Sequence, residues 1–385
     1  MHFRQSPACA FFLLFCFSIF LISGNVVAAT MVPPAPQIKA EGFLLIDFHS
    51  SNILAEKNAD ERMEPASLTK MLSTYVVDDG IANGNIKLSD QVTVSEKAWR
   101  MQGSRMFIEV GKKVSVEDLL KGVVIQSGND ATVALAEHVA GSEEAFASLM
   151  NQHAAKLGMA DSHFVNSTGL PHEDHYTTPR DLARLARALI RDFPENYPLY
   201  AVKQYSFNNI KQYNRNRLLW RNKFVDGIKT GHTESAGFCL VASALRDDMR
   251  LISVVLGTRS EQARTEESQK LLSYGFRFFE THRLYRADEA LTTTRIWKGA
   301  SEELPLGLEE DLYLTIPKGQ YKKLGSNMNI DTLITAPAEK SQTFGTVNIS
   351  LGDQKFAQRK LVALKRVEKG GLWTNLVDEV KLWFE

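Results

Sequence analysis

A serine and a lysine three residues apart are the first residues in this chain with the types and spacing for covalent chemistry. They are Ser67 and Lys70 in Ser67-Leu68-Thr69-Lys70, at the start of a predicted helix, where such residues share a face. A serine hydroxyl becomes a good nucleophile when a base removes its proton, and an amine with a lowered pKa is such a base. Backbone N–H groups at a helix start also stabilise negative charge on an attacked carbonyl. By itself this pair is weak evidence for catalysis, because serine and lysine are common in the first turns of helices.

Two other short patterns carry polar groups at predicted element boundaries. Ser127-Gly128-Asn129 lies between two predicted helices, but serine and asparagine two apart recur elsewhere in the chain. Lys229-Thr230-Gly231 ends a predicted strand, where a cation and a hydroxyl can hold a carboxylate and glycine permits close backbone approach. Each pattern alone is also compatible with an ordinary loop or strand end.

Hydrophobic spacing predicts the elements that position these residues. Leu68, Met71, Leu72, Tyr75 and Val76 follow helical spacing after Pro65. Strands at both ends of this region, with helices between them, indicate an α/β or α+β domain whose sheet is completed by distant segments. We predict strands at Phe43–Phe48, Ile53–Ala55, Phe224–Lys229, Gly237–Ala244 and Leu251–Leu256, and helices at about Val116–Ile125, Asp130–Val139, Glu143–Leu157, from Thr178, and at Gln262–Glu280.

The pattern changes beyond about Ala287. Apolar residues alternate with polar ones around Leu312–Ile316 and Val347–Leu351, and Gly352-Asp353 is a hairpin signal, so we predict a small all-β domain. The final stretch places two tryptophans and a phenylalanine on one helical stripe, which favours a helix in a membrane interface over one packed on its own domain. This stripe comprises Leu372, Trp373, Leu376, Val377, Val380, Trp383 and Phe384.

The N-terminus has the pattern of a secretory signal. Arg4 precedes an apolar run over Phe11–Ile22, and Val27-Ala28-Ala29 supplies small residues for cleavage after Ala29. The alternative is a retained anchor, for which the run is short. Cleavage leaves Cys239 as the single cysteine, in an apolar stretch that indicates buried packing rather than a nucleophile.

Composition excludes several classes of protein. Lys+Arg 45 against Asp+Glu 45 gives no net charge, which argues against a nucleic-acid partner held by a broad basic face. Three cysteines in 385 residues exclude a disulfide scaffold and a cysteine zinc site. His172-Glu173-Asp174-His175 offers metal-type ligands, but it lies in a turn before a capped helix, so a connecting segment is the favoured interpretation.

The three short patterns occur in a fixed order on a helix start, an interhelical loop and a strand. This set resembles the penicillin-binding proteins and serine β-lactamases. The surrounding residues Pro65–Met71, Gln126–Ala131 and Val225–Thr233 are similar to those of the low-molecular-mass D-alanyl-D-alanine carboxypeptidases, peptidase family S11. The resemblance implies a transpeptidase-like α/β (α+β) fold, a β-rich domain and an amphipathic C-terminal helix. The expected boundaries are 1–29 for the signal, 37–285 for the catalytic domain, 290–366 for the β-rich domain and 370–385 for the helix.

The resemblance assigns a role to each catalytic position. Ser67 would form the acyl-enzyme with Lys70 as its base, and Ser127 would relay a proton to the leaving D-alanine. Asn129 would orient Lys70 or the substrate amide.

The substrate-binding roles also follow from the resemblance. Lys229 and Thr230, next to Gly231, would bind the terminal carboxylate, and backbone N–H groups of Ser67 and His232 would form the oxyanion hole. Neither a metal nor an organic cofactor is implied. Arg215, Arg217 and Arg264 are further candidates at the carboxylate site, for which a surface arginine or a helix-start residue is the alternative.

The function that the resemblance implies is removal of the terminal D-alanine from peptidoglycan stem pentapeptides, with covalent inhibition by β-lactams. The expected place is the periplasmic side of the bacterial inner membrane. One alternative is a serine β-lactamase, against which the chain lacks the E-x-x-L-N pattern of class A enzymes. The other is a non-catalytic, penicillin-recognising wall-binding protein, against which the motif set is complete.

Overall fold

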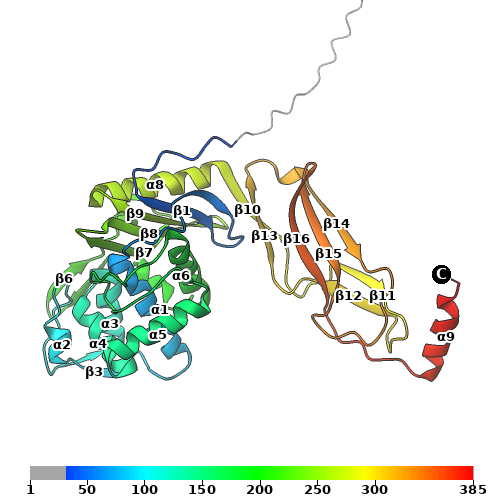
Figure 1. The fold of residues 1–385 in the computed structure, drawn as a ribbon, viewed down its shortest axis with the longest axis horizontal. Helices are drawn as coiled ribbons and strands as arrows, with labels where there is room; N and C mark the ends of the chain where they lie inside the picture. Colours follow the sequence, from blue (N-terminus) through cyan, green and yellow to red (C-terminus); the bar gives the residue numbers. More distant parts are fainter. Residues whose placement is uncertain (1–31, 385) are drawn as a thin grey trace, which may run out of the picture. The chain divides into compact units, whose positions relative to one another are not determined.

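The computed structural model describes residues 32–384, so the predicted signal segment and its cleavage site lie outside the described residues. A five-stranded antiparallel sheet is the centre of the first part of the chain (Figure 1). Its strand order is β2 (Ile53–Lys57), β1 (Gly42–Asp47), β9 (Met249–Thr258), β8 (Gly237–Arg246) and β7 (Val225–Thr233). Residue Leu44 is paired with Val254 across β1 and β9, so strands from distant segments complete one sheet, as predicted.

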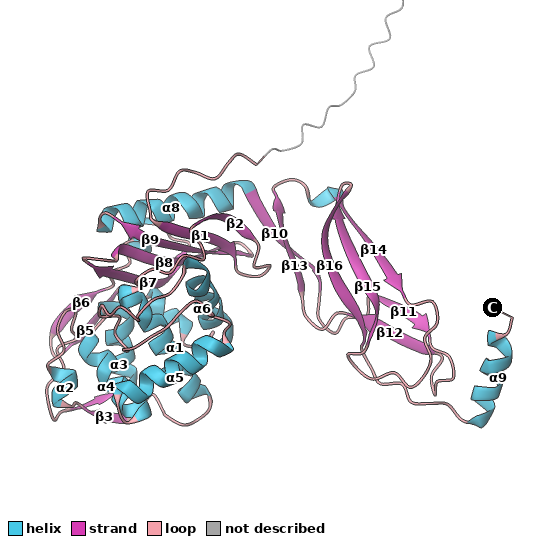
Figure 2. Ribbon diagram, in the orientation of Figure 1, coloured by secondary structure: helices cyan, strands magenta, loops and turns pink. Residues whose placement is uncertain are grey.

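Both faces of this sheet are buried. Successive strand residues point to opposite faces, so the side chain of Leu44 packs with α1 residues while that of Leu45 packs with Leu271 and Leu272 of α8. Figure 2 shows α8 on one side of the sheet and α1 to α6 on the opposite side. Leu218 and Leu219 of α7 pack in the same cluster as α8. These helices are α1 (Lys70–Ala82), α2 (Glu96–Trp99), α3 (Val116–Lys121), α4 (Asn129–Ala140), α5 (Glu143–Lys156), α6 (Pro179–Asp192) and α7 (Leu218–Arg221), with α8 at Glu261–Phe278.

Short elements connect the helices at the positions that matter for chemistry. A 3-10 turn η1 (Ala66–Thr69) leads into α1, a π-helical turn η2 (Gly122–Gln126) follows α3, and a 3-10 turn η3 (Tyr197–Ala201) follows α6. Two small two-stranded sheets are formed by β3 (Gln91–Thr93) with β4 (Lys113–Ser115), and by β5 (Gln204–Phe207) with β6 (Ile210–Tyr213).

Three predicted boundaries are wrong in informative ways. The α-helix predicted over Val116–Ile125 ends at Lys121, because the chain widens into the π turn η2 before Ser127. The long helix ends at Phe278, and Phe279 begins a strand. Strand β7 does not end at Lys229 but continues to Thr233, because the motif is hydrogen-bonded to β8, with Lys229 opposite Val241.

The later part of the chain is all-β, as predicted, except for a 3-10 turn, η4 (Tyr321–Lys323), and a final helix. Its two clusters of buried residues include Leu304, Leu306 and Ala363, and Leu314, Val347 and Leu361. Among residues 32–384, no helix is long and apolar enough to cross a membrane. The elements are β10 (Phe279–Tyr285) paired with β13 (Leu312–Pro317), a sheet of β11 (Thr292–Arg295), β12 (Glu303–Gly307), β16 (Gln354–Ala363), β15 (Thr343–Leu351) and β14 (Leu324–Ile330), and α9 (Leu372–Leu382).

Candidate active site

Ser67 and Lys70 meet as their spacing predicts. Ser67 lies in η1 and Lys70 is the first residue of α1. The Lys70 Nζ donates to Ser67 Oγ at 3.1 Å and to the backbone oxygen of Thr168 at 2.6 Å. Lys70 is fully buried whereas Ser67 is partly exposed. A partly exposed hydroxyl is therefore hydrogen-bonded to a buried amine.

Burial prepares this amine to act as a base. Burial and, to a smaller extent, the Arg215 cation lower the pKa of Lys70 from 10.5 to about 7, although the carboxylates of Asp130 and Glu143 oppose the shift. A lysine with a pKa near neutrality is unprotonated in a large fraction of molecules, and only that form accepts a proton from serine.

The Ser127 hydroxyl and the Asn129 amide come from the loop between η2 and α4. Ser127 closes η2 in the left-handed conformation, with φ 66°, and is 3% exposed. Asn129 begins α4 and its Nδ2 donates to the backbone oxygen of Gln102 at 2.6 Å, which fixes the amide against the 98–106 loop.

Asp130 is a supporting residue that the sequence interpretation missed. Its Oδ1 accepts the backbone N–H groups of Met106 and Ala131, and its Oδ2 accepts that of Phe107, all within 2.9 Å. The carboxylate thus holds the loop that carries Gln102 against the start of α4. An aspartate at a first helical turn signals a capping role, but the sequence gives no sign of its distant partners.

Lys229 is on β7, next to Thr230 of the cleft wall. It is 3% exposed, and its Nζ donates to the backbone oxygen of Thr230 at 3.2 Å. Burial lowers the pKa of Lys229 well below its usual value, and the cations Lys70, Arg215 and Arg264 lower it further. No described carboxylate forms an ion pair with Lys229, so a bound anion would supply the missing countercharge.

Gly231 is needed for packing of β7 as well as for its place in the cleft. A Cβ at Gly231 would lie 2.9 Å from the backbone oxygen of Pro65 and 3.2 Å from Leu68. The close approach therefore brings β7 against the segment that carries Ser67. The ring of His232 stacks on Phe238, with centroids 3.9 Å apart.

The three motifs border one cleft of about 470 Å³. Arg264 is 5% exposed and donates from Nη1 to the backbone oxygen of Gly231 at 3.1 Å, so it is more than a helix-start residue. Arg215 donates from Nε to the backbone oxygen of Gln126, whereas Arg217 is exposed and pairs with Glu261. The cleft is lined by Ser67, Gly103, Ser104, Ser127, Asn129, Thr168, Gly169, Leu170, Arg215, Thr230, Gly231, His232, Thr233, Phe238, Glu261 and Arg264.

The segment from residue 158 to 178 packs against η1. His175 accepts the N–H of Val165 at Nδ1, so its hydrogen is on Nε2, which donates to Thr69 Oγ1 at 2.8 Å. Burial lowers the pKa of His175 to about 4, which keeps the ring neutral. Gly169 has φ +83°, and a Cβ there would overlap the backbone oxygen of Ala66. The histidine therefore supports η1, and no described group of three or more His, Cys, Asp or Glu side chains is arranged to hold a metal.

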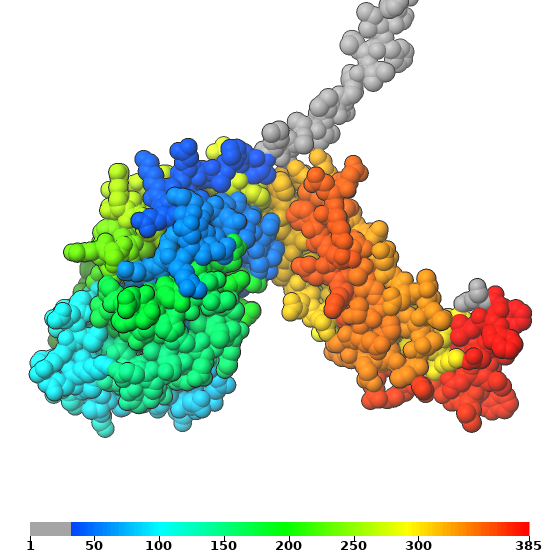
Figure 3. Space-filling view, viewed as in Figure 1, coloured from blue at the N-terminus to red at the C-terminus, as the bar shows by residue number. Residues whose placement is uncertain are grey.

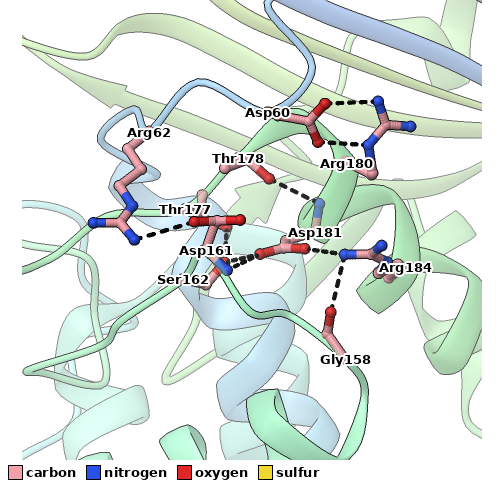
Figure 4. A network of polar contacts seen from close by, with 10 residues as sticks. All are labelled: Asp60, Arg62, Gly158, Asp161, Ser162, Thr177, Thr178, Arg180, Asp181 and Arg184. Atoms are coloured by element: carbon pink, nitrogen blue, oxygen red, sulfur yellow. Dashed lines mark hydrogen bonds and ion pairs between the residues drawn. The ribbon is translucent and has the colours of Figure 1, made fainter.

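A polar network at the start of α6 anchors this segment (Figure 4). The buried Asp181 carboxylate accepts the N–H of Asp161 at 3.0 Å, the hydroxyl of Ser162 at 2.8 Å and the Arg184 guanidinium at 2.6 Å. The Arg184 guanidinium also donates to the backbone oxygen of Gly158. Because these residues flank 163–175, the network fixes the ends of the segment that presents the Thr168 oxygen to Lys70.

Comparisons of the sequence with protein families give two consecutive matches. Residues 28–260 match the family described as D-alanyl-D-alanine carboxypeptidase, and residues 279–369 match the C-terminal domain of penicillin-binding protein 5. The chain is 45% identical over 374 residues to D-alanyl-D-alanine carboxypeptidase DacC of Escherichia coli (strain K12), covering 95% of this chain and 94% of that protein. It is 44% identical to DacA of the same strain, covering 92% and 90% respectively.

Solved structures are similar over both parts of the chain. Penicillin-binding protein 5 from Haemophilus influenzae matches with a TM-score of 0.85 at 40% identity, covering 88% of this chain and 100% of that one. Penicillin-binding protein 6B from Escherichia coli matches with a TM-score of 0.74 at 36% identity, covering 87% and 98%. The transpeptidase-like fold with an all-β domain, expected from the motifs, is confirmed.

Proposed function

The chain belongs to the D-alanyl-D-alanine carboxypeptidase family, and from this premise we propose how its residues perform the reaction. It is a serine-type D-Ala-D-Ala carboxypeptidase that removes the terminal D-alanine from peptidoglycan stem pentapeptides through an acyl-enzyme, and β-lactams acylate it. The observation that carries the residue assignment is the bond between the buried Lys70 amine and the cleft-facing Ser67 hydroxyl, 3.1 Å long.

Acylation begins with the unprotonated Lys70 amine. It accepts the Ser67 proton as Ser67 Oγ attacks the carbonyl carbon of the penultimate D-alanine, and a tetrahedral oxyanion forms. The backbone N–H groups of Ser67 and His232 stabilise the oxyanion, a role supported by the position of both residues on the cleft wall. When the C–N bond breaks, Ser127 relays the proton held by Lys70 to the amine of the leaving D-alanine, so Lys70 is again unprotonated. Water then attacks the ester and restores Ser67, with Lys70 as base.

The terminal carboxylate binds beside Thr230. Arg215 and Arg264 border the cleft, and the neighbouring Lys229 has no described ion pair, so positive charge is concentrated here. A substrate carboxylate supplies the missing negative charge and favours the protonated form of Lys229. Asn129, fixed by Gln102, orients the substrate amide at the other side of Ser67.

Release of D-alanine tests the assignment. The purified protein should release D-alanine from diacetyl-L-Lys-D-Ala-D-Ala, and Ser67→Ala should reduce release by a factor of at least about 10³, because the covalent route is removed. Ser326→Ala, an exposed serine of β14, is the matched control and should retain full activity. Activity of Ser67→Ala near that of the control would exclude Ser67 as nucleophile.

We also propose that α9 binds the surface of the inner membrane from its periplasmic side, after export and removal of residues 1–29. Trp373, Trp383 and Phe384 are 80%, 81% and 87% exposed, whereas Asp378 is 7% exposed and accepts the backbone N–H of Lys298. The polar side of α9 (red in Figure 3) is therefore held by the β-rich part, and its apolar side is uncovered. The proposed domain limits are 37–285 for catalysis, 290–366 for the β-rich domain and 370–385 for the membrane helix.

A further inference from the structure

A second cavity lies along α1, where Thr74 and Asp78, one and two turns after Lys70, form part of its wall. It has a volume of about 170 Å³. Its apolar wall is formed by Leu88, Leu120, Val124 and Leu199. A cavity of about 150 Å³ is large enough to hold benzene, so a single six-membered ring fits here.

A buried carboxylate lies in this otherwise apolar wall. Asp78 of α1 is 4% exposed and lines the cavity. Its Oδ1 accepts Asn196 Nδ2 at 2.9 Å, and no described residue donates to its Oδ2. No described cation pairs with Asp78 either. A buried carboxylate without a countercharge is costly for a protein, and structures usually provide a partner.

The charges at the cavity mouth do not supply that partner. Glu117, Lys121 and Glu195 line the cavity with Asp78. The Lys121 amine is already paired with Glu117 at 2.7 Å and with Asp118 at 3.8 Å. The lining thus carries three acidic side chains and one occupied cation, which favours a positively charged ligand.

The cavity also touches the elements that carry the catalytic motifs. Thr74, which lines it, uses its single hydroxyl hydrogen on the backbone oxygens of Lys70 and Met71, so the Tyr200 hydroxyl must donate to Thr74 Oγ1, 2.7 Å away. Val124 belongs to η2, which ends at Ser127. A molecule in the cavity therefore contacts walls that continue directly to Lys70 and Ser127.

We propose that this cavity is an effector site for a small organic cation, with an ammonium or amidinium group on Asp78 and a ring-sized apolar body against Leu120 and Val124. Occupancy alters the rate at which Ser67 is acylated. Binding of the cation is independent of the reaction, whereas the effect on acylation rests on the proposed function of Ser67.

The ionisation of Asp78 agrees with this geometry. Burial raises the pKa of Asp78 from 3.8 to about 7, and the Asn196 hydrogen bond opposes the shift. The charged groups that face it are Glu117 and Lys121 of α3 and Glu195 before η3, with the Tyr200 hydroxyl behind. A bound cation favours the ionised form, so binding should strengthen as the pH rises through 7.

Benzylamine, which is a cation at neutral pH, is the probe, and benzyl alcohol is its neutral counterpart. Titration calorimetry on the purified protein should detect benzylamine, and Asp78→Asn should weaken its binding about tenfold or more, since a charge-assisted bond is lost. Asp79→Asn is the matched control, because it makes the same change on the next residue, which faces His153 instead. Equal binding by wild type and Asp78→Asn, or no preference over benzyl alcohol, would overturn the cation site.

The effector role is tested on the same preparations. Saturating benzylamine should change the rate of acylation by a fluorescent penicillin at least about twofold in wild type and in Asp79→Asn, but not in Asp78→Asn. An unchanged wild-type rate at saturation would overturn the effector role. Absence of acylation without benzylamine would instead contradict the proposed function, so the two failures are distinguishable.

Discussion

At the scale of single residues, the site depends on two lysines that are held where their charge is unfavourable. Burial lowers the pKa of both Lys70 and Lys229, and the Arg215 cation also lowers both. The Lys70 cation further lowers the pKa of Lys229. Lys70 is thereby available as a base, and Lys229 is available to bind an anion. The neutral net charge of the chain conceals this local excess of positive charge.

The first prediction concerns the pH dependence of acylation. Only unprotonated Lys70 accepts the Ser67 proton, and its pKa is lowered to about 7, so the second-order rate of penicillin acylation should rise with pH through about 7 and level off above it. Stopped-flow measurement between pH 5.5 and 9 gives the curve.

Lys70→Arg is the companion variant. An arginine stays protonated over this range, so acylation should fall by about 10² to 10⁴ and lose its rise near pH 7. A wild-type rate that falls as the pH increases through 7 would contradict Lys70 as the base.

The sequence alone was sufficient to propose the reactive residues, but not to find the residues that support them. Ser67, Ser127 and Lys229 belong to short patterns whose order is informative. Thr168 contributes a backbone oxygen, and His175 reaches Thr69 from 106 residues away, so neither has a local signature. The interpretation of His175 as part of a connecting turn missed its role, because only the tertiary contact reveals it.

At the scale of elements, the turn η1 is fixed from both sides, by β7 and by the 158–178 segment. Both approaches require glycine, at Gly231 and at Gly169. Periodicity predicted the longer helices and the five strands of the central sheet, but not these two contacts. It also did not predict the π turn η2, because the apolar pattern of Val116–Ile125 is equally compatible with a continuous α-helix.

The second prediction tests the fit at Gly169. Gly169→Ala places a Cβ on the backbone oxygen of Ala66 at a positive φ, so D-alanine release should fall at least about tenfold while the Thr168 oxygen shifts from Lys70. Gly158→Ala is the control, because it has the same kind of φ, +72°, but nothing within 4 Å. The account of Gly169 fails if both variants show the same activity.

The third prediction concerns how Asp78 makes the free energy of unfolding depend on pH. Its folded pKa, about 7, lies above the unfolded value of 3.8, so the folded state binds more protons between these pH values. The stabilising contribution of protonated Asp78 to the free energy of unfolding is therefore fully present below about pH 4. This contribution is lost as the pH rises through 7. Asp78→Asn should gain stability relative to wild type over this window in urea denaturation.

Asp79→Asn should not reproduce that gain, since Asp79 is not buried. A stability difference between wild type and Asp78→Asn that is constant from pH 4 to pH 8 would show that Asp78 does not titrate in this window.

At the scale of the whole molecule, the chain combines a catalytic domain, a β-rich domain and an exposed terminal helix. Alternation predicted the β-rich domain because its strands have one buried face, as for Leu312, Leu314 and Ile316. The order of strands in the sheets was not predictable, since β1 pairs with β9 across more than 200 residues of intervening sequence. Long-range pairing of this kind leaves no local pattern.

The fourth prediction concerns α9. Purified protein should co-sediment with vesicles of phosphatidylethanolamine and phosphatidylglycerol, and Trp373→Ser with Trp383→Ser should reduce binding at least about tenfold, because two exposed aromatic side chains are removed from the interface. D-alanine release from a soluble peptide should not change. Equal sedimentation of both proteins would contradict the membrane role of α9.

The location of the covalent bond tests the central claim most directly. After incubation with benzylpenicillin, digestion and mass spectrometry should place one penicilloyl group on the peptide that contains Ser67, with no label in Ser67→Ala. A penicilloyl group on Ser127, or undiminished labelling of Ser67→Ala, would contradict the assignment of Ser67 and Lys70 as the reactive pair.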